Sequence, residues 1–172
     1  MAAGPFYPSS IYYGDTSGNT FPSFYVGTNQ GGTANAAPAD EGIGVVASLS
    51  ADSVVQLRFI LPPGSSAPSG PMKLILAGLA NAAPGTAANA KITVSDGVVS
   101  SSGGIPSGVS LSGETLVTLS WSTGSNDAYQ QAKVALSSSW QADGVLVVAL
   151  TFNHTSWTLA ANLTLLCWLV WE

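Results

Sequence analysis

From residue 43 onward, apolar and polar positions alternate with period two along most of the chain, and short turn-rich stretches interrupt the alternation. This pattern predicts half-buried β-strands, because successive side chains of a strand point to opposite faces of its sheet. No stretch shows helical spacing over a useful length. The predicted strands are 45–49, 55–61, 72–79, 90–95, 115–122, 129–136, 145–152 and 163–171.

About eight strands at this spacing are typical of a two-sheet sandwich. We therefore expect an all-β fold over residues 43–172, a jelly-roll-like β-sandwich or a related Greek-key arrangement. The four residues 50–53 contain Asp and two Ser between the first two apolar runs, which predicts that these two strands form a hairpin. Asp96 and Gly97 are expected to end the fourth strand in a turn.

Two of the predicted strands, 145–152 and 163–171, are apolar on both faces. Only one face of a strand meets the core of a sandwich, so their outer faces need a second cover. We expect that cover to come from the N-terminal segment or from another subunit.

Residues 1–42 lack sustained periodicity and combine Gly, Pro, Ser, Thr and Asn with a dense set of aromatic side chains. This composition indicates an extended N-terminal arm whose rings anchor it in a groove, rather than a flexible linker. The favoured interpretation is contact with a neighbouring subunit or a larger assembly. The alternative is an arm wrapped over the core of its own domain. The predicted anchors are Phe6, Tyr7, Tyr12, Tyr13, Phe21, Phe24 and Tyr25.

The chain is poor in charge: Lys and Arg number 4, Asp and Glu number 9, and charged residues make up 8% of the 172, against about 25% in ordinary soluble domains. With 46% hydrophobic residues the chain has ample material for a core. A formal net charge of −5 leaves no basic stripe for phosphates, which argues against nucleic-acid binding. The low charge suggests that partners bury much of the surface.

The beginning of the chain has no basic and apolar leader, and no run of about 18 apolar residues occurs. We therefore expect no membrane segment and synthesis in a cytoplasm. Cys167 is the only cysteine, so no intramolecular disulfide can form.

The residues that carry chemistry are sparse. His154 is the only histidine, which removes multi-histidine metal sites and lowers the case for a hydrolase triad, and most acidic residues fall in apparent turns. We predict no enzyme activity, no metal and no cofactor. Among the five Trp, Trp140 and Trp157 lie near loops and are the candidates for a glycan-stacking platform, although packing is the favoured role for all five.

The segment 137–172 resembles the closing hairpin of small jelly-roll proteins from tailed-phage particles. A turn containing Asp143 and Gly144 leads into an apolar strand, a polar turn follows, and Thr158-Leu159-Ala160-Ala161 opens the last strand. The resemblance implies a virion structural protein without enzymatic activity.

Two such roles follow from the resemblance. In the first, the protein is a capsid decoration (cement) protein on the capsid surface. Its expected partners are the major capsid protein and further copies of itself in a homotrimer. In the second, it is a tail or vertex fibre or adhesin module that binds a host surface glycan.

Overall fold

The structure is a computed structural model of the chain. It describes residues 3–14, 20–22, 25–26, 43–45, 52–60, 66, 68, 70–80, 86–100, 110–122, 129–140, 144–160 and 163–171. Within these ranges the chain forms β-strands and one turn of 3-10 helix, η2 (His154–Ser156). The prediction of an all-β sandwich is confirmed.

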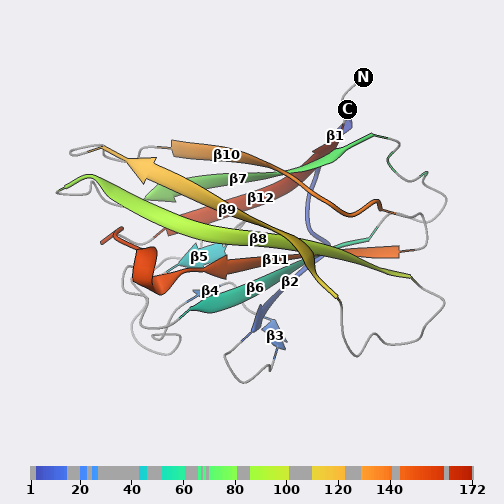
Figure 1. The fold of residues 1–172 in the computed structure, drawn as a ribbon, viewed down its shortest axis with the longest axis horizontal. Helices are drawn as coiled ribbons and strands as arrows, with labels where there is room; N and C mark the ends of the chain where they lie inside the picture. The colour runs from blue at the N-terminus through green and yellow to red at the C-terminus, as the bar shows by residue number, and fades with distance from the viewer. Residues whose placement is uncertain are drawn as a thin grey trace.

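Two sheets make up the sandwich, and we call them sheet I and sheet II (Figure 1). Sheet I has the order β10-β7-β12-β5-β4, and β1 pairs with β12 beside this path. Its strands are β10 (Tyr129–Ala135), β7 (Met72–Ala80), β12 (Leu163–Trp171), β5 (Ile43–Val45), β4 (Tyr25–Val26) and β1 (Ala3–Phe6).

Sheet II has the order β3-β2-β6-β11-β8-β9, and all its pairings are antiparallel. Its strands are β3 (Thr20–Pro22), β2 (Ser10–Gly14), β6 (Ser53–Ile60), β11 (Gly144–Phe152), β8 (Ala88–Ser100) and β9 (Ser112–Trp121).

The strands from β5 to β12 have jelly-roll connectivity. Successive strands change sheets at every step except from β8 to β9, which gives β10-β7-β12-β5 in one sheet and β6-β11-β8-β9 in the other. The predicted hairpin between the first two strands is wrong, because β5 pairs with β12 while β6 pairs with β11 and β2. A short polar turn is equally compatible with a hairpin and with a crossing between sheets.

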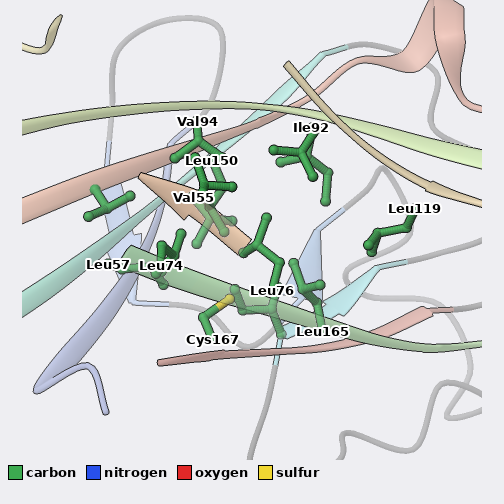
Figure 2. Packing of buried hydrophobic residues seen from close by; sticks show 14 of the residues in the cluster. Val55, Leu57, Leu74, Leu76, Ile92, Val94, Leu119, Leu150, Leu165 and Cys167 are labelled. Carbon is green, nitrogen blue, oxygen red and sulfur yellow. The ribbon is translucent and has the colours of Figure 1, made fainter. Parts of the chain in front are cut away.

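The core fills the space between the sheets, as the period-two pattern requires. In β6 every second side chain from Ser53 to Phe59 is buried, and in β12 the same holds from Leu163 to Leu169. Aliphatic side chains from both sheets meet in the middle (Figure 2). Trp121 is the largest fully buried side chain among the described residues, and it closes the core at the end of β9.

The described part of the N-terminal arm is built into the sandwich. β1 pairs with the C-terminal half of β12 in sheet I, and β2 pairs with β6 in sheet II, with only Tyr7, Pro8 and Ser9 between them. The backbone N–H of Ser9 donates to the carbonyl of Arg58 over 2.7 Å. Residues 3–14 therefore connect one sheet to the other. For this stretch the second interpretation applies, in which the arm packs on its own domain.

The expected cover by the N-terminal segment or another subunit stays a prediction, but the outer faces of the two doubly apolar strands differ in burial. On the outward side of β11, Val147 and Ala149 are each 2% exposed, so both faces of this strand are buried. On the outward side of β12, Leu166, Trp168 and Val170 are only half-buried. The partly exposed side chains of β12 therefore form part of an apolar outer surface on sheet I.

Candidate functional site

The outer surface of sheet I is the most apolar outward surface of the described residues. Leu74 and Leu76 of β7 belong to the core, so the alternating residues between and beyond them point outward. The same alternation applies to β10 and β12. We call this surface face I; its side chains are Lys73, Ile75, Ala77, Leu79, Tyr129, Gln131, Lys133, Ala135, Thr164, Leu166, Trp168 and Val170.

The register of the three strands arranges face I in rows. Leu79 lies between Tyr129 and Thr164, and Ala77 lies between Gln131 and Leu166. In the next row Ile75 lies between Lys133 and Trp168, and the last row contains Lys73 between Ala135 and Val170. The apolar residues of β7 and β12 are thus contiguous, while the two lysines lie toward one end.

Exposure varies across face I. Ile75 and Ala77 at its centre are 5% and 2% exposed, because the larger side chains of the neighbouring strands cover them. Leu79 and Tyr129 at one end are 42% and 54% exposed. Large apolar groups in water are unfavourable by about 25 cal/mol per Å² of exposed area, so a partner that covers this end gains free energy.

The outer surface of sheet II has a different composition. Its strands also present apolar residues, including Ile60 at 51% and Leu116 at 59% exposure. Polar side chains separate these residues on three strands: Gln56 and Arg58 on β6, Thr93 and Ser95 on β8, and Thr118 and Ser120 on β9. The outward side of β11 between them is apolar at Val145, Val147 and Ala149. This surface is mixed, as expected for a sheet that faces water.

The structure places the predicted anchor Phe6 inside its own domain. Its ring centroid lies 5.4 Å from that of Trp140, 6.2 Å from that of Trp171 and 6.4 Å from that of Phe59. Phe6 therefore packs against the edge of the hydrophobic core at the end of β1. The neighbouring anchor Tyr7 is 61% exposed and free to contact a partner.

The remaining predicted anchors are only partly described. Tyr12 and Tyr13 lie on β2, which is paired on both sides, while Phe21 lies on the edge strand β3 and Tyr25 on the edge strand β4. Their side chains, and Phe24 as a whole, lie outside the described residues. For these five residues the anchoring role stays a prediction.

The expectation of an exposed Trp140 is wrong. Its side chain is 3% exposed, and its indole N–H donates to the carbonyl of Gly144 over 2.9 Å. Proximity to a loop in sequence did not bring exposure, because the Trp140 ring packs against Phe6 and Phe59, with ring centroids 5.4 Å and 6.5 Å away. Trp140 cannot serve as a glycan platform in this conformation.

Trp157 follows the turn η2 and is half-buried, with its ring 5.9 Å from that of the core residue Phe152. Its indole nitrogen is buried and has no hydrogen-bond partner among the described residues. One side of Trp157 thus packs on the core. Of the two Trp proposed for glycan contact, only this one retains an accessible surface.

A buried acidic residue, which the sequence placed in a turn, forms the most extensive polar cluster among the described residues. Asp96 lies within β8, beside an irregularity in the pairing with β9, and is 1% exposed. Its Oδ1 accepts hydrogen bonds from the Ser137 N–H at 3.0 Å and the Ser137 hydroxyl at 3.1 Å, and its Oδ2 accepts from the Ser138 N–H at 2.6 Å. Asp96 thereby attaches the segment after β10 in sheet I to a strand of sheet II.

A second acidic residue holds the connection between β11 and β12. Asp52 Oδ1 lies 2.7 Å from His154 Nδ1 and accepts a hydrogen bond from the His154 N–H at 2.8 Å. The side-chain hydrogen bond to His154, followed by the backbone one, lowers the pKa of Asp52 below its ordinary value. The two side chains are 51% and 36% exposed, so this pair is a surface contact.

Three further observations concern the metal-ligating residues, the thiol and the helices of the described part of the chain. Within the described ranges, no three or more His, Cys, Asp or Glu side chains gather closely enough to hold a metal ion. Burial raises the pKa of the Cys167 thiol, which keeps it protonated and unreactive inside the core. The described residues also include no helix with the length and apolarity needed to cross a membrane.

Comparison with known proteins gives little to add to this geometry. The sequence matches no protein-family model and no curated protein. Among solved structures it is similar to the isomalto-dextranase of Arthrobacter globiformis T6 complexed with panose, with a TM-score of 0.40 and 18% sequence identity. The similarity covers 72% of this chain and 17% of that one. A likeness at this level does not extend to activity.

Proposed function

We propose that the protein is a non-enzymatic structural component of a tailed-phage virion, and that it acts as a decoration protein that clamps neighbouring subunits of the capsid. The resemblance of segment 137–172 to jelly-roll proteins of phage particles is one support for this proposal. It gives the major capsid protein and further copies of the chain as partners, and a trimer as the form that such proteins adopt.

Face I is the observation that carries the proposal. A chain with 8% charged residues has little to keep an apolar surface in solution, yet the described residues leave Leu79, Tyr129 and Trp168 accessible on one side of one sheet. Protein-binding surfaces are enriched in such aromatic and aliphatic groups at their centres. An assembly role makes use of this surface, whereas a soluble catalyst has no need of it.

The clamp acts through many weak contacts. Each copy joins adjacent capsid subunits, and each contact adds only the free energy of burying a modest apolar area. Because the copies bind an array, the total effect grows with their number and opposes the outward pressure of a packaged genome. Tyr7, exposed on the segment that links the two sheets, is the described arm residue available for the capsid contact.

Quantitative mass spectrometry of purified particles tests the proposal. We expect copies in the hundreds, at a simple ratio to the major capsid protein. A few copies per particle would instead support a tail or vertex position, and absence from the particle would overturn the virion role.

Point variants test the arm better than truncation does. β1 and β2 are paired with strands of the sandwich, so truncation of the arm would change folding as well as binding. Tyr7→Ala should lower particle occupancy without altering the fold. Leu116→Ala, which removes a similarly exposed apolar group from β9, is the matched control and should leave occupancy unchanged.

The second candidate, a tail or vertex adhesin module that binds a host glycan, depends on Trp157. Trp157 is half-buried, and its backbone N–H donates to the carbonyl of His154, whose exposed side chain pairs with Asp52. A half-accessible ring in the same segment as exposed hydrogen-bonding groups supports glycan contact. A titration with host surface glycans followed by Trp fluorescence, repeated with Trp157→Ala, tests this role. A response that Trp157→Ala abolishes would support the adhesin, and no response would remove it.

A further inference from the structure

We propose that β1 is an exchangeable strand: in the assembled protein, β1 of one copy pairs with β12 of the next copy, and its Phe6 enters the same aromatic site there. The exchange joins the copies directly. It rests on the self-association that the proposed function includes, and it does not depend on contact with a capsid.

The rings around Phe6 come from three segments, none of which is β1 or β2. Phe59 lies on β6, Trp140 follows β10 and Trp171 lies on β12, and their ring centroids are 6.4, 5.4 and 6.2 Å from that of Phe6. Phe59 and Trp140 also contact each other, with centroids 6.5 Å apart. The Phe6 of a second copy therefore meets the same three rings as the Phe6 of the same chain.

β1 has little backbone pairing to hold it on its own domain. Among the described strands it pairs only with β12, and the register shifts between Ala3 and Phe6 (Figure 1). β12 pairs along its whole length with β7 on its other side, so β12 keeps its place in sheet I when β1 leaves. Release of β1 thus breaks few hydrogen bonds and leaves the core strands paired.

The link between β1 and β2 has no spare length. Ser9 is already fixed to sheet II, because its N–H donates to the carbonyl of Arg58 over 2.7 Å and its Oγ accepts from the Ile60 N–H over 3.1 Å. The chain from Phe6 to Ser9 can reach at most about 11 Å, and two packed sheets lie about 10 Å apart. The link therefore runs almost straight from one sheet to the other.

A short, straight link favours exchange over closure on the same domain. Closure allows the link only one path, whereas a second copy can take the position to which an extended link leads. Pro8 supports the extended path, because the residue before a proline avoids the helical region of the backbone. That residue is Tyr7, and with 61% of its side chain exposed it does little to hold the link on the domain.

The exchanged and closed forms contain the same β1–β12 contacts, so the link and the protein concentration decide between them. When each copy passes β1 to the next, the copies form a ring. A ring of three agrees with the expected homotrimer. It uses β1 and its site on β12, and face I lies outside this contact.

Photo-cross-linking of the full chain in a mixture of isotopes tests the exchange. A light batch and a heavy-isotope batch both carry p-azidophenylalanine in place of Phe6, and equal amounts are mixed in urea, refolded at about 100 µM and irradiated. Mass spectrometry then identifies the cross-links from position 6 to peptides that contain Trp140 or Trp171. Random exchange predicts that about half of these cross-links join a light chain to a heavy one.

A longer link should reverse the exchange. Inserting Gly-Ser-Gly-Ser between Tyr7 and Pro8 supplies the slack for β1 to close on its own domain, and should lower the light–heavy fraction at least about fivefold. The matched control places the same insertion between Ser102 and Gly103, in a Ser- and Gly-rich stretch far from β1 in the sequence, and should leave the fraction unchanged. Circular dichroism of each refolded protein checks that it folds.

Cross-links confined to chains of the same isotope would overturn the inference, and so would equal effects of the two insertions. Copy number on purified particles is a separate result. A closed monomer that is abundant on capsids would contradict the exchange alone, whereas light–heavy cross-links in a protein absent from particles would contradict the virion role alone.

Discussion

Two acidic side chains attach connecting segments to the sandwich, one near each end of β8, in very different surroundings. At one end Asp96 is 1% exposed and accepts three hydrogen bonds from Ser137 and Ser138. At the other end Asp52, whose side chain is 51% exposed, accepts two from His154, which leads into the connection that Asn153 fastens to β8. Both attach a loop to a strand with short hydrogen bonds.

The difference in burial decides what each contact contributes to stability. Water replaces the partners of an exposed carboxylate when its hydrogen bonds break, so the net gain from such a pair is small. Asp96 is 1% exposed, so little water can take the place of its donors, and removing the carboxylate leaves the N–H groups of Ser137 and Ser138 without this acceptor. The hydrogen bonds at Asp96 and Asp52 have similar lengths, so length does not predict which of them contributes more to stability.

The largest expected effect is at Asp96. Asp96→Ala removes the acceptor of three part-buried hydrogen bonds and should lower the free energy of unfolding by about 3 kcal/mol. Urea denaturation followed by Trp fluorescence measures the change. Asp96→Asn, which retains one side-chain oxygen as acceptor, should cost less, and a loss below about 1 kcal/mol for Asp96→Ala would show that the two ends are equivalent after all.

A smaller loss is expected at Gly113, which lies next to the Asp96 cluster. Its φ of +68° is in the left-handed region, and an added Cβ would lie 2.4 Å from the Ser137 hydroxyl oxygen. Gly113→Ala should therefore cost about 2 kcal/mol in unfolding free energy, from backbone strain and the clash together.

The background variant Ser137→Gly separates these two causes, because it removes both Ser137 atoms that an added Cβ would meet. In that background Gly113→Ala should cost about 1 kcal/mol, the strain alone. An unchanged cost in the double-mutant cycle would assign the whole effect to the backbone.

Two tryptophans extend the comparison to N–H groups. The indole N–H of Trp140, in the segment attached by Asp96, donates to Gly144, while that of Trp157, at the other end, has no partner among the described residues. Trp140→Phe should therefore destabilise the protein by about 1 kcal/mol more than Trp157→Phe. Thermal melting of the two variants in parallel measures the difference, and equal losses would mean that the bond to Gly144 contributes nothing.

The smallest expected effect is at Asp52. Its folded-state pKa is lowered, so the contribution of this group is present above its unfolded pKa, near 4, and is lost as the pH falls through the folded pKa. Asp52→Asn should cost no more than about 0.5 kcal/mol at pH 7, as for other exposed pairs. The gap between wild type and variant should close on acidification below about pH 4 in urea titrations, and a gap that persists there would assign the effect to something other than ionisation.

The sequence predicted the strands well because alternation is a local signal. β7, β10, β11 and β12 begin and end within two residues of their predicted bounds, and the total number of long strands agrees with a jelly roll. Partner choice is a non-local property, which is why the pattern around residues 50–53 predicted a hairpin that the topology replaces with a crossing between sheets.

The candidate sites were harder to predict. Asp96 followed by Gly97 has the composition of a turn, and only the irregular pairing with β9 and the arrival of Ser137 from 41 residues away reveal a buried cluster. The sequence predicted one strand of face I, because residues 163–171 are apolar on both faces. The outer side of β12 is more exposed than that of β11, and this difference depends on the neighbouring strands, which the sequence pattern does not identify.

The pairing of β1 with β12 brings the two ends of the described chain together. Ala3 lies opposite Trp171, and both termini are at the same pole of the sandwich (Figure 1). A peptide or protein fused to either end would leave the domain from this pole, and a short linker joining the ends would permit circular permutation. The domain is thus suited to display cargo in one direction while both of its broad sheet surfaces stay available.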